Sequence, residues 1–195
     1  MNAVPALILL VFLAPVMILS AILIRLQDGG PILFGHVRVG RGCVKFKCLK
    51  FRSMTVDAEA RLSAHLKQHP RAQMEWEHYQ KLHKDPRVTP WGNFMRKSSI
   101  DELPQLINVL LGDMNLVGPR PIVEAEVPRY GRYIEAYAAV QPGITGLWQV
   151  SGRSGTTYRR RVALDTVYRR IRSPWLDLWI LFLTVGVVLT RKDSY

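Results

Sequence analysis

The chain has 195 residues, of which 48% are hydrophobic, so it is long enough for one domain with a substantial core. Its 27 lysine and arginine residues outnumber its 15 aspartate and glutamate residues, which gives a net charge of +12 at pH 7. This excess favours polyanionic partners, namely nucleic acid, anionic lipid headgroups or phosphorylated substrates. Cys43 and Cys48 lack the neighbouring ligands of a zinc site, and we expect free thiols in a reducing compartment.

The N-terminal segment is an uncharged, apolar run from Pro5 to Ile24. As a helix it would extend about 30 Å, the thickness of the apolar core of a bilayer. No basic stretch precedes the run and no small-residue cleavage site ends it, so a cleaved signal peptide is not expected. Pro15 should kink the helix, which permits either a bent spanning helix or a re-entrant one. We therefore expect a membrane-inserted helix over residues 1–27 and a separate domain over residues 28–195.

Basic residues gather after this run, at Arg25, Arg38, Arg41, Lys45, Lys47 and Lys50. Because positive charge marks the cytoplasmic side of a membrane segment, we expect the domain on that side. Two short strands follow, at residues 32–39 and 44–51, and the glycine-rich link between them predicts a β-hairpin. A helical pattern then runs from Asp57 to about Lys84, with a break at Pro70. This order indicates an α+β fold that is mainly helical.

The segment Lys97–Pro121 reads KSSIDELPQLINVLLGDMNLVGPRP and places the adjacent carboxylates Asp101 and Glu102 where a helix should begin. Pro104 fits only among the first helical positions, so we expect the helix to open near Asp101. The apolar residues Leu103, Leu106, Ile107, Leu110 and Leu111 then predict a core-facing stripe, and Gly112 a stop. Two interpretations of the carboxylates stay open. In the first they cap the helix, with Asp101 as N-cap or with Ser99 and Glu102 as a capping box, and in the second the pair is catalytic.

The C-terminal third contains a glycine-rich loop and two further helical patterns. The loop, Gln141–Arg153, reads QPGITGLWQVSGR. A helix over Tyr158–Ile171 carries Asp165 on its apolar side, where a carboxylate needs a partner, either an arginine or a metal site. The apolar stretch Trp175–Leu189 is shorter than a normal membrane span, and predicts either an interfacial helix or an ordinary core helix.

Three strings, DELPQL from Asp101, GDMNLVGPRP from Gly112 and QPGITGLWQVSGR from Gln141, resemble those of the bacterial sugar transferases, the monotopic phosphoglycosyl transferases. The resemblance extends back to KFRSM at Lys50 and forward to YRRRVALDTVY at Tyr158, and so covers nearly the whole chain. The segment KLHKDPRVTPWG, residues 81–92, is most similar to the exopolysaccharide-initiating galactose or glucose phosphate transferases. In this family a Ser-Pro pair makes the membrane helix re-entrant, whereas here Ala14 stands before the proline.

The resemblance implies transfer of a hexose-1-phosphate from a UDP-sugar to undecaprenyl phosphate, with release of UMP. This reaction would be the first membrane step of exopolysaccharide or O-antigen type glycan synthesis, at the bacterial inner membrane. Asp101 would be the nucleophile that forms an acyl-phosphate intermediate, and a helix N-terminus would favour its ionised form. Glu102 would serve in metal ligation or proton handling. Mg²⁺ would be the cofactor, held by Asp101 and Glu102.

Substrate-binding residues follow from the same resemblance and from the need for cations beside a diphosphate. We expect Lys50, Arg52, Arg96, Arg120, Gln149, Arg153 and Asp165 in this role. Membrane lipids are expected partners and a homo-oligomer is open, as is the identity of the sugar. A nucleic-acid binder would explain the charge, but the basic residues are dispersed and no recognition motif accompanies them. A membrane scaffold would explain the apolar segments but not the three motifs.

Overall fold

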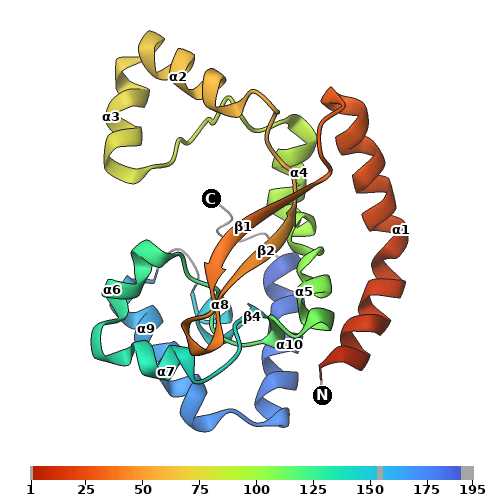
Figure 1. The fold of residues 1–195 in the computed structure, drawn as a ribbon, viewed down its shortest axis with the longest axis vertical. Helices are drawn as coiled ribbons and strands as arrows, with labels where there is room; N and C mark the ends of the chain where they lie inside the picture. Colours follow the sequence, from red (N-terminus) through yellow and green to blue (C-terminus); the bar gives the residue numbers. More distant parts are fainter. Residues whose placement is uncertain (1, 153–155, 190–195) are drawn as a thin grey trace.

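The computed structural model describes residues 2–152 and 156–189 (Figure 1). It has the expected α+β, mainly helical fold with one antiparallel hairpin. The helices are α1 (Ala3–Asp28), α2 (Ala58–Gln68), α3 (Pro70–Tyr79), α4 (Pro90–Ser98), α5 (Gln105–Leu111), α6 (Val127–Tyr130), α7 (Ile134–Ala138), α8 (Leu147–Val150), α9 (Tyr158–Ile171) and α10 (Pro174–Leu189). The strands are β1 (Leu33–Val39), β2 (Lys45–Phe51), β3 (Asn115–Val117) and β4 (Gly143–Thr145), and 3₁₀ turns lie at Arg41–Cys43, Ile100–Glu102, Glu124–Glu126 and Gly131–Tyr133.

The helix α1 runs without interruption through Pro15 and curves along one side of the molecule (Figure 1). One stripe of the helix packs on the body, at Ala6, Leu10, Leu13, Met17, Ser20, Ala21 and Ile24. The opposite face is exposed and apolar, at Val4, Leu7, Ile8, Val11, Phe12, Ile18, Leu19 and Ile22. Within Ala3–Asp28 the chain is thus one continuous, curved helix, and the choice between a spanning and a re-entrant helix stays a prediction. Among the described residues it is the helix long and apolar enough to cross a membrane, by length and composition.

The predicted hairpin is confirmed, with β1 antiparallel to β2 and Phe34 opposite Lys50. Asn108 of α5 covers the free edge of β2. Its Nδ2 donates to Lys47 O at 2.8 Å and its Oδ1 accepts from Leu49 N at 2.9 Å, so one side chain forms the two hydrogen bonds that a third strand would form. Asn108 is 1% exposed. This buried amide fixes α5, and the residues just before it, against the end of β2.

The predicted start of α5 is wrong by about one turn. Ser99 adopts a left-handed backbone with φ 58°, which ends α4, and a 3₁₀ turn at Ile100–Glu102 precedes the α-helix, which begins at Gln105. The leucine stripe is correspondingly only half right. Leu106 is buried, but Leu111 is 70% exposed, because α5 presents the face that carries Asn108 to β2.

Two of the sequence motifs meet backbone to backbone. β3 pairs in parallel with β4, with Val117 opposite Thr145. A Cβ added to Gly118 would lie 2.4 Å from Gln141 O, and one added to Gly143 would lie 2.1 Å from Gly118 N. Neither separation is possible for a real side chain, so both glycines are required where GPRP follows β3 and QPG precedes β4. The motifs therefore occur together because their backbones pack on each other.

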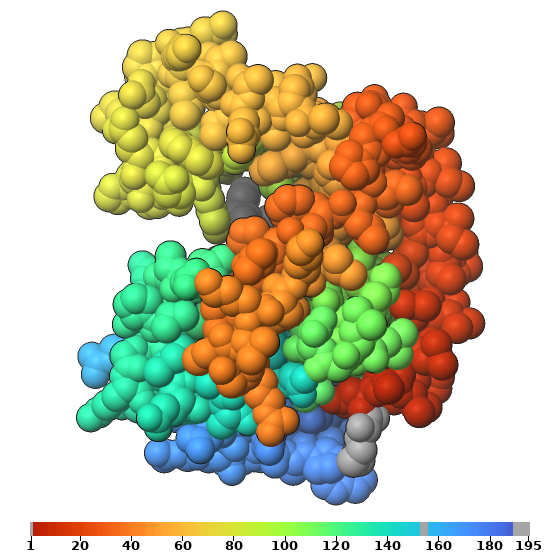
Figure 2. All heavy atoms as spheres, in the orientation of Figure 1, coloured from red at the N-terminus to blue at the C-terminus, as the bar shows by residue number. Residues whose placement is uncertain are grey.

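The helices α2 and α3 form an arm that projects from the rest of the molecule (Figure 1), and the space-filling view shows it standing apart (Figure 2). No residue of either helix is buried. The predicted break at Pro70 is confirmed, whereas the helix ends at Tyr79 and not near Lys84, because Gln80 is left-handed with φ 52°. The arm is thus held by few contacts outside itself.

The last two helices differ in how they meet the core. Thr157 caps α9 by accepting from Arg160 N, and α9 buries Val162 and Tyr168. Ile180 is the buried residue among residues 174–188 of α10. The outer face of α10 is exposed at Trp175, Leu178, Trp179, Phe182 and Val185. Of the two predictions for this stretch, the ordinary core helix does not hold, since among residues 174–188 only Ile180 is buried and a whole apolar face is exposed.

Candidate functional site

The predicted carboxylate pair lies beside a lysine at the end of β2. Lys50 Nζ is 2.6 Å from Glu102 Oε1 and 3.8 Å from Asp101 Oδ2. Neither Ser99 nor Pro104, the residues that precede the 3₁₀ turn and α5, has a side-chain capping bond. The capping interpretations are therefore wrong for both carboxylates. The hairpin and the Ile100–Glu102 turn instead bring one cation and two acidic groups together.

Burial dominates the electrostatics of Asp101, which is only 8% exposed. Removal from water raises the pKa of Asp101 to about 6, the positive charges of Lys50 and Arg96 oppose this rise, and the negative charge of Glu102 adds to it. The net shift of the pKa is thus opposite to the one expected from a helix terminus, because desolvation is its largest cause. A carboxylate with this pKa is still mostly ionised at pH 7.

Two arginines extend the positive charge from Lys50 along the same side of the hairpin. Burial lowers the pKa of Arg38, and repulsion from Arg120 lowers it further, so the two guanidinium groups are neighbours. Arg38 Nη1 also donates to Pro121 O at 3.4 Å, while Pro119 O accepts from Gly143 N at 2.8 Å. The backbone on both sides of Arg120 is therefore held, as its flanking prolines predicted.

Arg38 was missed as a site residue by the sequence reasoning. The signal that could have found it is the hairpin register. Phe34 lies opposite Lys50, and Arg38 is four residues beyond Phe34, so Arg38 and Lys50 share one face of the hairpin.

Two further predicted cations, Arg52 and Arg96, already have partners. Arg52 Nη1 donates to Asp28 Oδ2 at 2.6 Å and thereby joins the end of α1 to the end of β2. Its predicted contact with a diphosphate stays a prediction that would require this pair to open. Arg96 Nε donates to Ser53 Oγ at 2.9 Å, and its charge acts on Asp101. Of the two, Arg96 is the one that the structure connects electrostatically to the carboxylate pair.

Asp165 lies in the interior and is 2% exposed. Its Oδ2 accepts from Tyr130 Oη at 2.8 Å, and burial raises its pKa to about 6 against the effects of that hydrogen bond and of Arg161. The expected partner was an arginine or a metal, whereas the hydrogen-bond donor is a tyrosine and the arginine acts through its charge. A contact of Asp165 with substrate stays a prediction.

Arg161 was also missed, because it stands in a run of three arginines that reads as a solvated helix face. It is 8% exposed, and its Nη1 is 3.2 Å from Glu126 Oε1. The guanidinium lies 4.9 Å from the centre of the Trp148 ring and 5.2 Å from that of Tyr158. Among the described residues its Nε and Nη2 have no hydrogen-bond partner. Arg161 therefore keeps buried donors available to an oxygen ligand.

The glycine-rich loop contributes Gln149, whose Nε2 donates to Ile144 O at 3.0 Å, while its buried Oε1 has no partner among the described residues. Arg153, the other residue predicted in this loop, lies outside the described residues. Gln149 also borders a cavity of about 240 Å³ that reaches Glu102.

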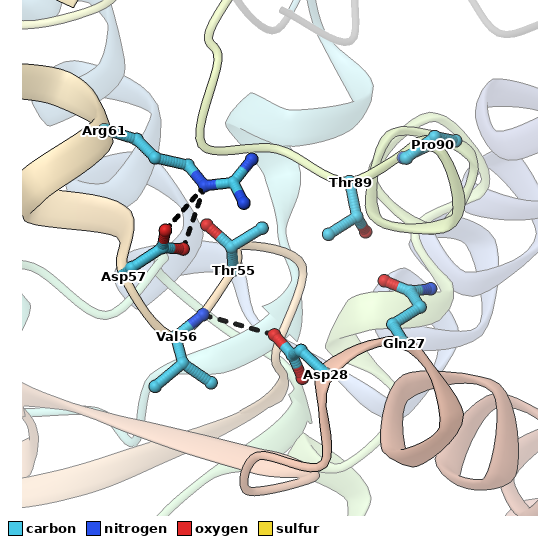
Figure 3. A pocket seen from close by; sticks show the side chains of 8 residues that line it. All are labelled: Gln27, Asp28, Thr55, Val56, Asp57, Arg61, Thr89 and Pro90. Carbon is cyan, nitrogen blue, oxygen red and sulfur yellow. Dashed lines mark hydrogen bonds and ion pairs between the residues drawn. The ribbon is translucent and has the colours of Figure 1, made fainter. Parts of the chain in front are cut away.

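A larger cavity of about 560 Å³ lies at the end of α1 (Figure 3). Its lining is Gln27, Asp28, Thr55, Val56, Asp57, Arg61, Thr89 and Pro90. Arg61 Nε is 2.9 Å from Asp57 Oδ1, and Asp28 is paired with Arg52. The charged side chains that line this cavity are therefore each paired with an opposite charge. None of the predicted site residues lines it, and we assign no catalytic role to it.

The donor set at the carboxylate pair fits Mg²⁺. Asp101 and Glu102 offer hard oxygen ligands, and Mg²⁺ in proteins commonly takes one or two carboxylates and completes its shell with water and substrate phosphates. Among the described residues no group of three or more His, Cys, Asp or Glu side chains could hold a metal ion. A metal here would therefore depend on substrate oxygens.

Comparison with known proteins agrees with the motifs. The profile of the Bacterial sugar transferase family matches residues 1–191. The chain is 48% identical over 194 residues to the UDP-galactose-lipid carrier transferase of Erwinia amylovora, a match covering all of this chain and 40% of the relative. It is 51% identical over 169 residues to the undecaprenyl-phosphate galactose phosphotransferase of Salmonella typhimurium, covering 87% of this chain and 36% of the relative.

A shorter relative matches over most of its own length. The exopolysaccharide production protein ExoY of Sinorhizobium fredii is 45% identical over 190 residues, which cover 97% of this chain and 84% of that protein. By contrast, the chain spans about two fifths of the length of the Erwinia relative. The family expected from the three motifs is thus confirmed by a match over nearly the whole chain, and this chain belongs to the bacterial sugar transferase family.

Proposed function

We propose that this chain is a phosphoglycosyl transferase that moves a hexose-1-phosphate from a UDP-sugar to undecaprenyl phosphate. The products would be undecaprenyl-diphosphate-sugar and UMP. The observation that carries the proposal is the pair of buried Asp101 and half-buried Glu102 beside Lys50, with the charge of Arg96 also acting on Asp101. The names of the relatives support it, since they describe a UDP-galactose-lipid carrier transferase and an undecaprenyl-phosphate galactose phosphotransferase.

Asp101 would act as the nucleophile. Its carboxylate oxygen attacks the phosphorus that bears the sugar, the bond from that phosphorus to the UMP oxygen breaks, and UMP leaves with the electron pair. The aspartyl phosphosugar is then attacked by a phosphate oxygen of undecaprenyl phosphate, which releases the Asp101 carboxylate. One phosphoanhydride is lost and one is formed, so no other energy source is needed. The raised pKa fits this role, because burial makes the carboxylate less solvated while leaving it mostly ionised at pH 7.

The cations would stabilise the charge that develops on the transferring phosphate. The two carboxylate contacts of Lys50 support this role, as do the held backbone around Arg120 and the hydrogen bond from Arg38 to Pro121 O. Asp101 and Glu102 would hold Mg²⁺, which supplies further neutralisation of the diphosphate. Glu102 either ligates the metal or handles a proton, and metal ligation through Oε1 would require its 2.6 Å contact with Lys50 to open.

The proposed site of action is the cytoplasmic face of a bacterial inner membrane, with membrane lipids as partners. The exposed apolar faces of α1 and α10 support this placement, since such faces are unfavourable in water. Lys and Arg residues that follow α1 support the cytoplasmic side. A tag placed before Met1 and one after Tyr195 should both be labelled only from the cytoplasm if the helix is re-entrant. Periplasmic labelling of the N-terminal tag would instead indicate a spanning helix.

The test of the reaction is UMP release from a panel of UDP-sugars with Mg²⁺, with and without undecaprenyl phosphate. We expect one hexose donor to give lipid-linked product, and a stoichiometric release of UMP before lipid is added, with ping-pong kinetics. UMP release that strictly requires lipid, without a labelled protein, would replace the covalent step by direct attack of the lipid phosphate. Absence of any lipid-linked product from every donor would contradict the function itself.

A further inference from the structure

A mostly apolar cavity of about 240 Å³ lies between α1, α5 and α10. Most of its walls are leucine, isoleucine and valine side chains, among them Leu9, Leu106 and Val188, and Glu102, Thr145 and Thr184 also line it. Thr145 Oγ1 and Thr184 Oγ1 are hydrogen-bonded to each other at 2.7 Å, so these hydroxyls are satisfied within the wall. The lining therefore offers a ligand chiefly hydrocarbon contacts, with polar groups at few places.

One wall of this cavity belongs to the catalytic pair. Glu102 lines it, and Lys50 Nζ is 2.6 Å from Glu102 Oε1. The adjacent Asp101 is the proposed nucleophile. If the hydrocarbon part of a ligand fills the cavity, the end of the ligand next to Glu102 would lie beside Lys50 and the transferring phosphate.

Other walls come from the two helices with exposed apolar faces. Leu9 of α1 is 37% exposed although it lines the cavity, and its neighbour Ile8 is 63% exposed. On α10, Val188 lines the cavity and Val185 is 59% exposed. The cavity is therefore bounded by helices whose outer faces suit a bilayer, which gives a hydrocarbon chain an apolar approach.

We propose that this cavity binds the isoprenoid units next to the phosphate of the polyprenyl phosphate acceptor. The proposal rests on the proposed function and adds the place where the lipid is held. At roughly 30 Å³ per water molecule in the liquid, the cavity corresponds to only about eight waters. It therefore receives the first part of a long chain and leaves the remainder to the bilayer.

The geometry favours this occupant over the two other candidates. A UDP-sugar would bury many hydroxyls against apolar walls, which is unfavourable without compensating hydrogen bonds. A phospholipid acyl chain would fit the walls, but a glycerol unit separates its phosphate from its hydrocarbon. In a polyprenyl phosphate the phosphate is bonded directly to the isoprenoid chain, so the hydrocarbon can lie against Leu106 while the phosphate meets Lys50.

The experiment fills the cavity with larger side chains on α1 and on α10, and measures the KM for the lipid acceptor. Leu9→Trp and Val188→Trp fill it from opposite sides, and the matched controls Ile8→Trp and Val185→Trp add the same ring to the exposed faces of the same helices. Initial rates are measured in detergent with farnesyl phosphate and with undecaprenyl phosphate. The KM for UDP-sugar and the UMP released without lipid report whether the donor half of the site is intact.

We expect the KM for both acceptors to rise about tenfold or more in the two cavity variants, because part of the apolar contact is lost. The KM for UDP-sugar should stay within about twofold, and both controls should resemble wild type. The milder Leu9→Phe and Val188→Phe should show a smaller rise and remain informative if the tryptophan variants do not fold.

An unchanged acceptor KM in the cavity variants would overturn the proposal, and so would an equal rise in the controls. An effect on undecaprenyl phosphate but not on farnesyl phosphate would also overturn it, since the cavity would then not hold the units next to the phosphate. Loss of lipid-linked product in wild type would be a failure of the proposed function and is recognised separately.

Discussion

Asp101 and Asp165 are two buried aspartates with similar electrostatics and different surroundings. They are 8% and 2% exposed, and burial is the largest cause of a pKa of about 6 in both. Asp101 lies among charged side chains on a 3₁₀ turn, with Lys50 3.8 Å away. Asp165 lies on α9 and accepts a hydrogen bond from Tyr130 at 2.8 Å. The pKa alone therefore does not tell a nucleophile from a structural acid.

The two aspartates differ in whether their partners can release them and bind a substrate instead. Lys50 is partly exposed and can transfer its contacts to an incoming phosphate, and the cavity that Glu102 lines reaches the same pair. Tyr130 is 2% exposed and packs against Tyr137 at 5.2 Å between ring centres, so its hydroxyl is fixed. A buried acid is suited to catalysis when its compensation comes from cations that a substrate can share.

The largest expected effect is that of Asp101→Asn compared with Asp165→Asn. The first should lower UMP release by about 10³-fold or more, because it removes the nucleophilic oxygen anion while keeping the size of the side chain. It should also abolish labelling of the protein by a sugar phosphate. The second should keep turnover within about tenfold, because an amide still accepts from Tyr130. Equal losses in both variants would remove the distinction between the two acids.

Removal of the partners sharpens the same comparison. Lys50→Met should lower UMP release by about 10²-fold, because a positioned cation beside the transferring phosphate is lost. Tyr130→Phe should instead lower the free energy of unfolding by about 1–3 kcal/mol, since Asp165 loses its buried donor, with little change in turnover. Steady-state rates and denaturant unfolding in detergent measure both. A Lys50→Met variant of normal activity would assign Lys50 to structure.

Arg120→Lys keeps the charge but removes the planar pair of donors. We expect turnover to fall about 10-fold or more, because a guanidinium can bind a phosphate through two hydrogen bonds and an ammonium cannot do so with the same geometry. Arg71→Lys, on the exposed arm, is the matched control and should behave as wild type. Near-normal turnover of Arg120→Lys would show that Arg120 supplies charge only, or that it serves the fold.

Much of the fold could be predicted because local patterns determined it. The hairpin and the break at Pro70 follow from strand patterns and proline chemistry, and α9 follows from its helical pattern. The start of α5 could not, because it depends on Ser99 adopting a left-handed backbone and on Asn108 bridging Lys47 and Leu49 of β2. Those contacts join residues about sixty positions apart, which no local periodicity reports.

The site was predictable to a similar degree. The carboxylate pair and Arg120 came from the motifs, but the position of Lys50 against Glu102 arises from tertiary packing. Arg38 and Arg161 were missed because a single arginine on a strand, or one in a run of three, ordinarily reads as solvated surface. Only the register of the hairpin shows that Arg38 shares a face with Lys50, and only the packing of α9 shows that Arg161 is buried. Arg52 was predicted to bind substrate, but it is paired with Asp28, and that pairing depends on where α1 ends.

The last expected effect is on stability and not on turnover, and it is the pH dependence of unfolding in Asp165→Asn. The pKa of Asp165 is about 6 in the folded protein and near 3.8 when solvated, so the folded state binds this proton more tightly. The stability that this provides is full below about pH 4 and is lost as the pH rises through 6. Since one pKa unit corresponds to 1.36 kcal/mol, the charged carboxylate costs up to ~3 kcal/mol at pH 7.

Asp165→Asn lacks this titration. Relative to wild type, its free energy of unfolding should therefore increase between pH 4 and pH 7, with the two proteins most alike at the acid end. Denaturant unfolding at a series of pH values measures the difference. If the difference is constant across that range, Asp165 is already ionised at pH 4 in the folded protein, and its hydrogen bond with Tyr130 and the charge of Arg161 outweigh its burial. Asp165 would then be an anion whose burial is offset by its partners, and it would resemble Asp101 only in being buried.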